Sequence, residues 1–221
     1  MLAGASGVHV RAARRGAARQ RAAAAPGVQL CGVMARVLIL GEEERALALG
    51  RAVLAMGHAA RIVASTPGSS SAGADAVAGA GLQIVAGDPL RLASLRGALA
   101  QVTVACWLFG EGSLNEDEAL ALHGDRLASF IPQLVDAGGR GLIYERASRT
   151  LGAAVGDRGE AIARELAQRN ALALAVLQAP ARSRGAAQED RERAPARSAP
   201  QPAEERWPAS ACAALARMLS A

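Results

Sequence analysis

Three residues of the chain are candidates for moving a proton in a reaction, namely Tyr144, His123 and Glu145. Tyr144 is the only tyrosine, and all 25 residues counted as lysine or arginine are arginine, so no lysine amine can assist it. Arginine keeps its proton in proteins and cannot replace lysine in such chemistry. A packed Tyr144 and a surface or packing role for His123 are the alternatives, and we assign no catalytic residue.

Cysteine and histidine are the usual ligands of transition metals, and both are scattered in this sequence. The three cysteines show no metal-binding spacing, and their odd number provides no disulfide framework. The three histidines are equally far apart. The sequence therefore predicts no metal site and favours a reducing cytoplasm.

A phosphate group is commonly bound where a glycine-rich turn meets the first turn of a helix. Residues 37–40, VLIL, end at Gly41 as a buried strand would, and a helical pattern follows. The turn itself reads Gly-Glu-Glu-Glu at 41–44, so only its first glycine is present. These acids either repel a phosphate or occupy its place, stabilised by the helix dipole.

Short apolar runs alternate with helical patterns over most of the chain. The expected strands are 36–40, 60–65, 82–86, 102–109, 141–145 and 172–177. The expected helices are 44–56, 72–80, 90–100, 116–137 and 157–169. Gly57 should end the first helix in a left-handed conformation, and Pro132 should kink or break the fourth. This alternation predicts an α/β fold, a doubly wound and mostly parallel six-stranded sheet in the order 3-2-1-4-5-6 with helices on both faces.

Composition divides the chain into four parts. Residues 1–34 hold five arginines and no acid, which predicts a disordered leader, a start codon assigned too early or a transit peptide. Residues 35–180 form the α/β domain, and 181–208 a disordered linker or loop. Residues 209–221 form a C-terminal helix that packs back on the domain or binds a partner. The other 20 arginines match the 20 acids, so we expect no nucleic-acid partner, and no apolar run is long enough to span a membrane.

Four segments, in this order, resemble a known family: RVLILG with GHAARIVAST, VAGD, CWLFG, and LHGDRLASFIPQLVDAGGRGLIYERAS. Together they make residues 36–178 similar to the NAD-dependent epimerase/dehydratase group, the extended or atypical short-chain dehydrogenases. The resemblance implies a Rossmann-like fold and a site for NAD or NADP at the carboxyl ends of the strands. The residues it implies for cofactor binding are Gly41, Ser65, Thr66, Gly87, Asp88, Trp107, Phe109 and Gly110.

Several of these residues have a structural alternative. Asp88 fits a turn or helix cap as well as an adenine contact, and Trp107 and Phe109 fit burial in the sheet as well as the crevice mouth. The second strand lacks the terminal acid that would hold a ribose 2′-hydroxyl, whereas Arg45 could hold a 2′-phosphate. The family's Tyr-x-x-x-Lys pair has no counterpart, since Tyr144 lies in the fifth strand and lysine is absent. Binding of NAD or NADP is therefore expected to be weak or lost.

Three functions remain open. The first is a degenerate, non-catalytic Rossmann-type protein that binds a dinucleotide or small molecule weakly, as a sensor or accessory subunit. The second is an active NAD(P)-dependent epimerase or oxidoreductase with Tyr144, His123 and Glu145 as substitute catalytic residues. The third is a structural module that forms a homodimer through the helix at 116–137 and the C-terminal helix. The sequence favours the first, because the order of elements is kept while the glycine turn and the lysine are missing.

Overall fold

The computed structural model describes residues 34–64, 81–111, 114–179 and 202–220, with the backbone alone for 202–206. All of them belong to one compact unit, Met34–Ala221. The predicted leader before Met34, the helix expected at 72–80 and the linker residues 181–201 lie outside the described residues. Ser65 and Thr66 also lie outside them.

The six predicted strands form a single parallel sheet in the predicted order, β3-β2-β1-β4-β5-β6. Their bounds are β1 Arg36–Gly41, β2 Ala59–Ala64, β3 Leu82–Ala86, β4 Val104–Leu108, β5 Gly141–Arg146 and β6 Ala173–Gln178. Every residue of β4 is buried, as its uncharged sequence requires for a strand covered on both faces. The doubly wound α/β fold is thus confirmed.

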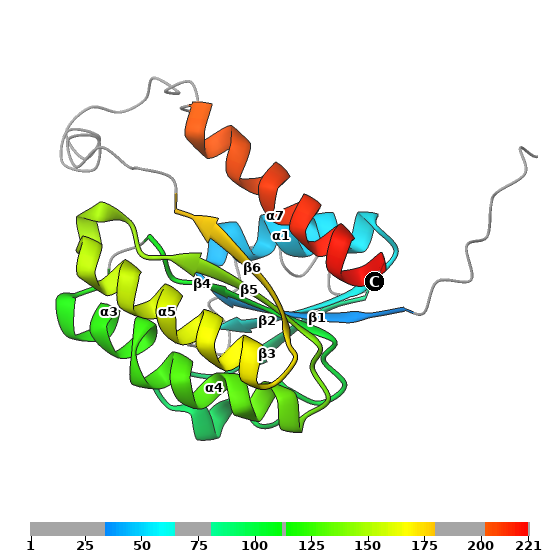
Figure 1. Cartoon of the computed structure of the whole chain (residues 1–221). Helices are drawn as coiled ribbons and strands as arrows, with labels where there is room; N and C mark the ends of the chain where they lie inside the picture. Colours follow the sequence, from blue (N-terminus) through cyan, green and yellow to red (C-terminus); the bar gives the residue numbers. More distant parts are fainter. Residues whose placement is uncertain (1–33, 65–80, 112–113, 180–201, 221) are drawn as a thin grey trace, which may run out of the picture. The chain divides into compact units, whose positions relative to one another are not determined.

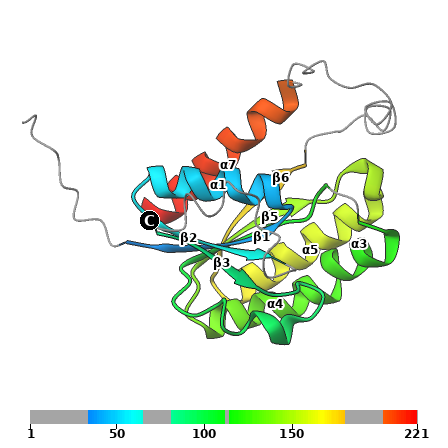
Figure 2. The same ribbon diagram turned by 180° about the vertical axis from the view of Figure 1, so that it is seen from behind.

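Helices cover both faces of the sheet (Figures 1 and 2). Their bounds are α1 Glu43–Ala55, α3 Glu116–His123, α4 Asp125–Asp136, α5 Ala153–Arg169 and α7 Pro202–Ser220, with short 3-10 turns η2 Leu92–Leu95 and η3 Arg149–Leu151. Side chains alternate across each strand, so Leu38 and Leu40 join the core beneath α4 and α5. Val37 and Ile39 join the opposite core beneath α1 and α7.

Glycine conformations determine where two of the helices end. Gly57 follows α1 with φ +82°, the left-handed conformation that the sequence predicted. The helix predicted at 116–137 is two helices, and the break lies at Gly124 rather than at Pro132. A Cβ at Gly124 would lie 2.6 Å from the Leu120 carbonyl oxygen, so only glycine fits this turn. Pro132 stays within α4 on its exposed side, where the carbonyl that loses a bond can face water.

The C-terminal helix α7 begins at Pro202 instead of 209, so residues 202–208 are helical rather than part of a linker. Proline is well suited to the first turn of a helix, because its missing N–H would have no partner there. The helix packs against α1, β5 and β6, and Trp207, Ala211 and Leu215 enter the core on that face. The helix expected at 90–100 is reduced to η2. None of the helices in the described part of the chain has the length and apolar character needed to cross a bilayer.

Candidate functional site

The candidate site lies at the carboxyl ends of β1 and β4, where the order of the strands reverses. Gly41 ends β1 and pairs with Leu108, the last residue of β4. The two backbones approach so closely that a Cβ at Gly41 would lie 2.5 Å from the Leu108 carbonyl oxygen. Helix α1 begins at Glu43, so its first turn starts immediately beyond this edge of the sheet.

The three glutamates that replace the glycine-rich turn are exposed at the start of α1. Glu42 is the N-cap residue, although its side chain makes no capping hydrogen bond, and Glu43 and Glu44 lie in the first turn. Acids in this position interact favourably with the helix dipole. The alternative that they stabilise the helix where a phosphate would otherwise bind is compatible with this placement.

Arg45 differs from the glutamates before it, because its side chain is largely buried against the sheet. Its Nη2 forms an ion pair with Oε1 of the fully buried Glu145, the fifth residue of β5. Its Nη1 lies 3.9 Å from Oε2 of Glu111, which is also buried. The guanidinium carbon lies 4.0 Å from the centre of the Trp207 ring, on α7. Arg45 therefore connects α1 to β5, to the segment after β4 and to the C-terminal helix.

Glu145 is held from two sides. Besides Arg45, the backbone N–H of Gly110 donates a hydrogen bond of 2.8 Å to Oε2 of Glu145. A Cβ at Gly110 would lie 2.5 Å from Cγ of Glu145 and 2.8 Å from Cβ of Ala179. There is therefore no room for a side chain at residue 110. Both carboxylate oxygens of Glu145 are thus bound within the chain, which leaves the group poorly placed to accept a proton from a substrate.

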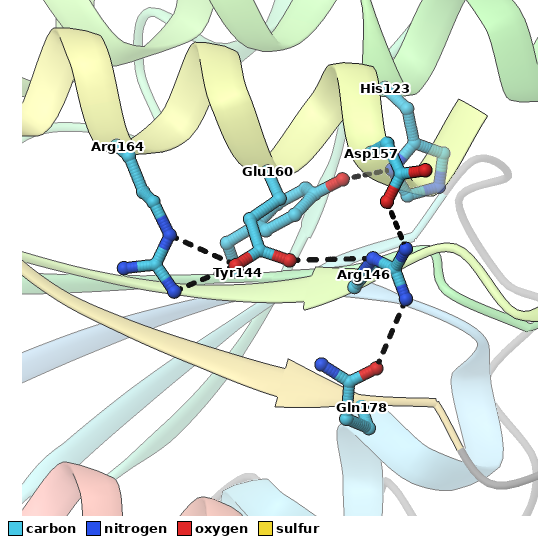
Figure 3. A network of polar contacts seen from close by, with 7 residues as sticks. All are labelled: His123, Tyr144, Arg146, Asp157, Glu160, Arg164 and Gln178. Carbon is cyan, nitrogen blue, oxygen red and sulfur yellow. Dashed lines mark hydrogen bonds and ion pairs between the residues drawn. The ribbon is translucent and has the colours of Figure 1, made fainter. Parts of the chain in front are cut away.

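Tyr144 and His123, the other two potential acid–base residues, meet in the core (Figure 3). The Tyr144 hydroxyl lies 2.7 Å from Nδ1 of His123, and Nε2 of His123 lies 3.0 Å from the carbonyl oxygen of Phe109. A carbonyl only accepts, so Nε2 carries the proton and Nδ1 accepts the hydrogen bond from the hydroxyl. Burial lowers the pKa of His123, and burial followed by the nearby Glu160 raises the pKa of Tyr144. The structure supports the packing role for both residues, with His123 buried rather than at the surface.

Trp107 and Phe109 both belong to the buried core. Trp107 is completely buried, and its indole N–H donates a 3.2 Å hydrogen bond to the Leu122 carbonyl. The centre of its ring lies 5.0 Å from that of the Phe109 ring and 4.7 Å from that of the Phe130 ring. Both aromatic side chains are therefore buried.

Gly87 and Asp88 form the turn after β3. A Cβ at Gly87 would lie 2.7 Å from a methyl carbon of Leu95, so a side chain at residue 87 would push the Leu95 side chain aside. Asp88 accepts a 2.8 Å hydrogen bond from the backbone N–H of Leu90, as an aspartate does when it stabilises a turn. Its own N–H donates to the hydroxyl of Ser94. The turn role of Asp88 is observed, and its carboxylate is half exposed at the same edge of the sheet.

A polar network around Arg146 was missed by the sequence analysis (Figure 3). Arg146 forms ion pairs with Asp157 and, at 3.3 Å, with Glu160, and Glu160 also binds Arg164 at 2.7 Å. Glu160 and Arg164 are four residues apart on α5, the helix after β5. Acid and arginine at this spacing on a helix are the signal that could have identified the pair. In the described ranges, no three His, Cys, Asp or Glu side chains are grouped so that they could hold a metal ion.

No protein-family model and no curated protein matches the sequence. Among solved structures, a short-chain dehydrogenase from Streptomyces avermitilis is similar with a TM-score of 0.56 and 16% identity, over 85% of this chain and 84% of that one. BdcA from E. coli has a TM-score of 0.53 and 17% identity over 66% of this chain and 85% of its own. A short-chain dehydrogenase/reductase superfamily protein from Agrobacterium tumefaciens, with bound NAD, has a TM-score of 0.50 and 14% identity over 64% of this chain and 48% of its own. At these identities the likeness establishes the fold, and the chain has the Rossmann fold of short-chain dehydrogenase structures, as the sequence predicted.

Proposed function

We propose that this chain is a non-catalytic Rossmann-type protein that binds NAD, NADP or another nucleotide weakly or not at all, and acts as a sensor or accessory subunit. The observation that carries the proposal is the buried ion pair between Arg45 and Glu145 at the carboxyl ends of the central strands. In an open α/β sheet this edge is where a ligand binds. Here the chain's own charged side chains and the indole of Trp207 are packed together at it.

The second candidate, an active oxidoreductase with substitute residues, is less well supported. A general acid or base must come within hydrogen-bond reach of the atom it protonates or deprotonates. Tyr144 is fully buried and bonded to His123, while both oxygens of Glu145 are bound within the chain. On the helix after β5, Glu160 and Arg164 form an ion pair with each other and cannot reproduce the chemistry of tyrosine and lysine.

Titration with oxidised and reduced NAD and NADP tests the proposal. The unfolding temperature is followed for the wild type, for Glu43→Gly, and for Asp117→Gly, which removes an acid from the first turn of another helix. We expect little shift in the wild type at millimolar cofactor and a clear rise in Glu43→Gly, because that variant removes a carboxylate from the first turn of α1. Saturation at about 100 times the dissociation constant would add ~2.7 kcal/mol to stability.

Two results, one from an activity assay and one from the titration, would count against the proposal. Turnover of a nicotinamide cofactor by the wild type with any sugar or ketone would establish an enzyme. A large rise in unfolding temperature for the wild type at micromolar cofactor would establish tight binding. Equal rises in unfolding temperature for Glu43→Gly and Asp117→Gly would remove the role assigned to Glu43. Of these two residues, Glu43 is the one that lies at the candidate site.

We also propose a homodimer as the partnership to test, and the cytoplasm as the compartment. Leu120 on α3 is a large hydrophobic residue that is exposed, and it lies in the segment for which the dimer was predicted. Cys106 and Cys212 are free thiols, which supports a reducing compartment. Light scattering on the full chain should give a dimer mass that falls in Leu120→Glu, and a monomer at every concentration contradicts the dimer.

A further inference from the structure

The carboxylate of Glu145 is bound as an anionic ligand would be. It receives a charged donor from Arg45 on one oxygen and a backbone N–H, from Gly110, on the other. These donors come from the start of α1 and from the segment just after β4, which flank the switch point of the sheet. A charged donor combined with a backbone amide is a common means of binding carboxylate and phosphate groups.

Two donors of this cluster have no hydrogen-bond acceptor among the described residues, namely Nη1 of Arg45 and Nε1 of Trp207. Nη1 faces Glu111 only at ion-pair distance, 3.9 Å. Trp207 is 6% exposed and its ring lies on the guanidinium. Buried donors in folded proteins are nearly always paired. Additional oxygen atoms at this place, such as those of a bound oxyanion, would complete the cluster.

Fold stability alone is a weak reason for such a cluster. A buried ion pair contributes little compared with apolar residues of the same volume, since both charges lose their hydration. Ala46 and Leu47, which follow Arg45 on α1, are apolar and buried. Two apolar side chains in place of Arg45 and Glu145 would therefore suit these surroundings. The position of the pair at the ligand-binding edge of the sheet gives it a more specific role.

We propose that Arg45 and the Gly110 amide form a binding site for a small oxyanion, a carboxylate or a phosphate group, which Glu145 occupies from within the chain. A ligand enters by displacing Glu145, and Trp207 covers the face of the guanidinium. The inference rests on the proposed function in one respect, because both place a ligand at the same edge of the sheet. Its test uses small anions without a nucleotide, so its failure leaves the result of the cofactor titration unaffected.

Replacement of Glu145 by alanine removes the atoms that acetate would restore. The unfolding temperatures of the full-length wild type, Glu145→Ala and the double variant Arg45→Ala/Glu145→Ala are measured in chloride, acetate and inorganic phosphate at equal ionic strength. We expect acetate or phosphate to raise the unfolding temperature of Glu145→Ala by roughly 5 °C at saturation, with little effect on the wild type or the double variant. Acetate alone identifies a carboxylate site, whereas phosphate alone identifies a phosphate site.

The inference is overturned if neither anion stabilises Glu145→Ala more than chloride does, or if the double variant responds equally. Glu145→Ser is the second variant, in case alanine at this buried position prevents folding. If neither variant folds in chloride, the circular dichroism spectrum in acetate and in phosphate becomes the readout. Recovery of the folded spectrum that is lost again in the double variant supports the site, and no recovery in either anion overturns it.

Discussion

The Tyr144 hydroxyl and the His123 imidazole form a 2.7 Å hydrogen bond in the core, between β5 and the last residue of α3. The other imidazole nitrogen bonds the carbonyl of Phe109, just beyond β4, so one side chain connects three elements. The side chains best suited to acid–base chemistry therefore satisfy each other's hydrogen bonds. Their hydrogen bonds join α3 to the sheet at the point where Gly124 breaks the helix.

Tyr144→Phe should destabilise the fold by about 1–3 kcal/mol, because it leaves a buried ring nitrogen of His123 without its donor. Equilibrium unfolding in urea measures the effect. The cycle is completed with His123→Leu and the double variant, and a coupling of about 0.5–3 kcal/mol is expected for residues in contact. Effects that simply add would show that the hydrogen bond contributes nothing to stability.

Stability should fall in acid because of His123. Burial, opposed by the hydrogen bond to Phe109, lowers its pKa below the usual value of 6.5. As the pH drops through 6.5 the unfolded chain binds a proton that the folded chain does not, so protons favour unfolding. The contribution of His123 to the free energy of unfolding is complete above pH 6.5. It is lost as the pH falls from 6.5 towards the lower pKa of the folded state, by at most about 1.4 kcal/mol per pH unit.

Urea unfolding at about pH 7.5, 6.5 and 5.5 measures this dependence. The slope should be smaller in His123→Leu, which has no titrating ring. His58→Gln is the control, because it removes a histidine from the connection before β2 that takes no part in the hydrogen bonds to Tyr144 and Phe109. Identical slopes in the wild type and His123→Leu would assign the acid sensitivity to other groups.

Gly159→Ala should destabilise the chain although alanine is the better helix former. A Cβ at residue 159 of α5 would lie 2.0 Å from the Tyr144 hydroxyl oxygen and 3.0 Å from the His123 carbonyl oxygen. Overpacking of this kind costs about 1–3 kcal/mol, more than the gain of about 0.5–1 kcal/mol in helix propensity. Thermal unfolding of Gly159→Ala beside Gly97→Ala provides the comparison, because a Cβ at Gly97 meets nothing within 4 Å.

The same clash predicts a partial rescue. In Tyr144→Phe the oxygen nearest to the added methyl group is gone, so Gly159→Ala should cost less in that background than in the wild type. The comparison separates a local clash from a general effect on α5. An equal cost in both backgrounds would mean that the hydroxyl is not what residue 159 must avoid.

Most of the fold could be predicted because its signals are local. The uncharged run that forms β4 and the glycine after α1 identify their elements without knowledge of distant residues. The break at Gly124 was missed because proline is the stronger local signal, whereas an exposed proline is tolerated within α4. The early start of α7 was missed because few large apolar residues precede Trp207.

The candidate site was harder to predict, since it depends on contacts between distant residues. Gly41 located the edge of the sheet correctly, but nothing near Arg45 indicates that its side chain turns inward. Its partner Glu145 is 100 residues further along the chain. Trp207, which covers the guanidinium, belongs to a segment with the composition of a linker. Only the three-dimensional fold brings these residues together.

Arg45→Met should be much more harmful than the loss of an exposed charge, because it leaves Glu145 buried without its counterion. Breaking a buried pair from one side costs about 3–5 kcal/mol. The matched control is Arg158→Met, whose pair with Asp125 at 3.5 Å is largely exposed and should contribute less than about 1 kcal/mol. Equilibrium unfolding of both variants in guanidinium chloride at neutral pH gives the comparison.

Arg45→Met combined with Glu145→Met should recover much of the stability lost in Arg45→Met. Replacing both buried charges by apolar side chains removes the desolvation cost together with the attraction, and such exchanges are often neutral or stabilising. The recovery is expected to be incomplete, because the Gly110 N–H loses its acceptor and the Trp207 ring loses its cation. If the double variant is as unstable as Arg45→Met, the cost in the single variant does not come from an uncompensated Glu145, and the packing of the arginine itself would be responsible.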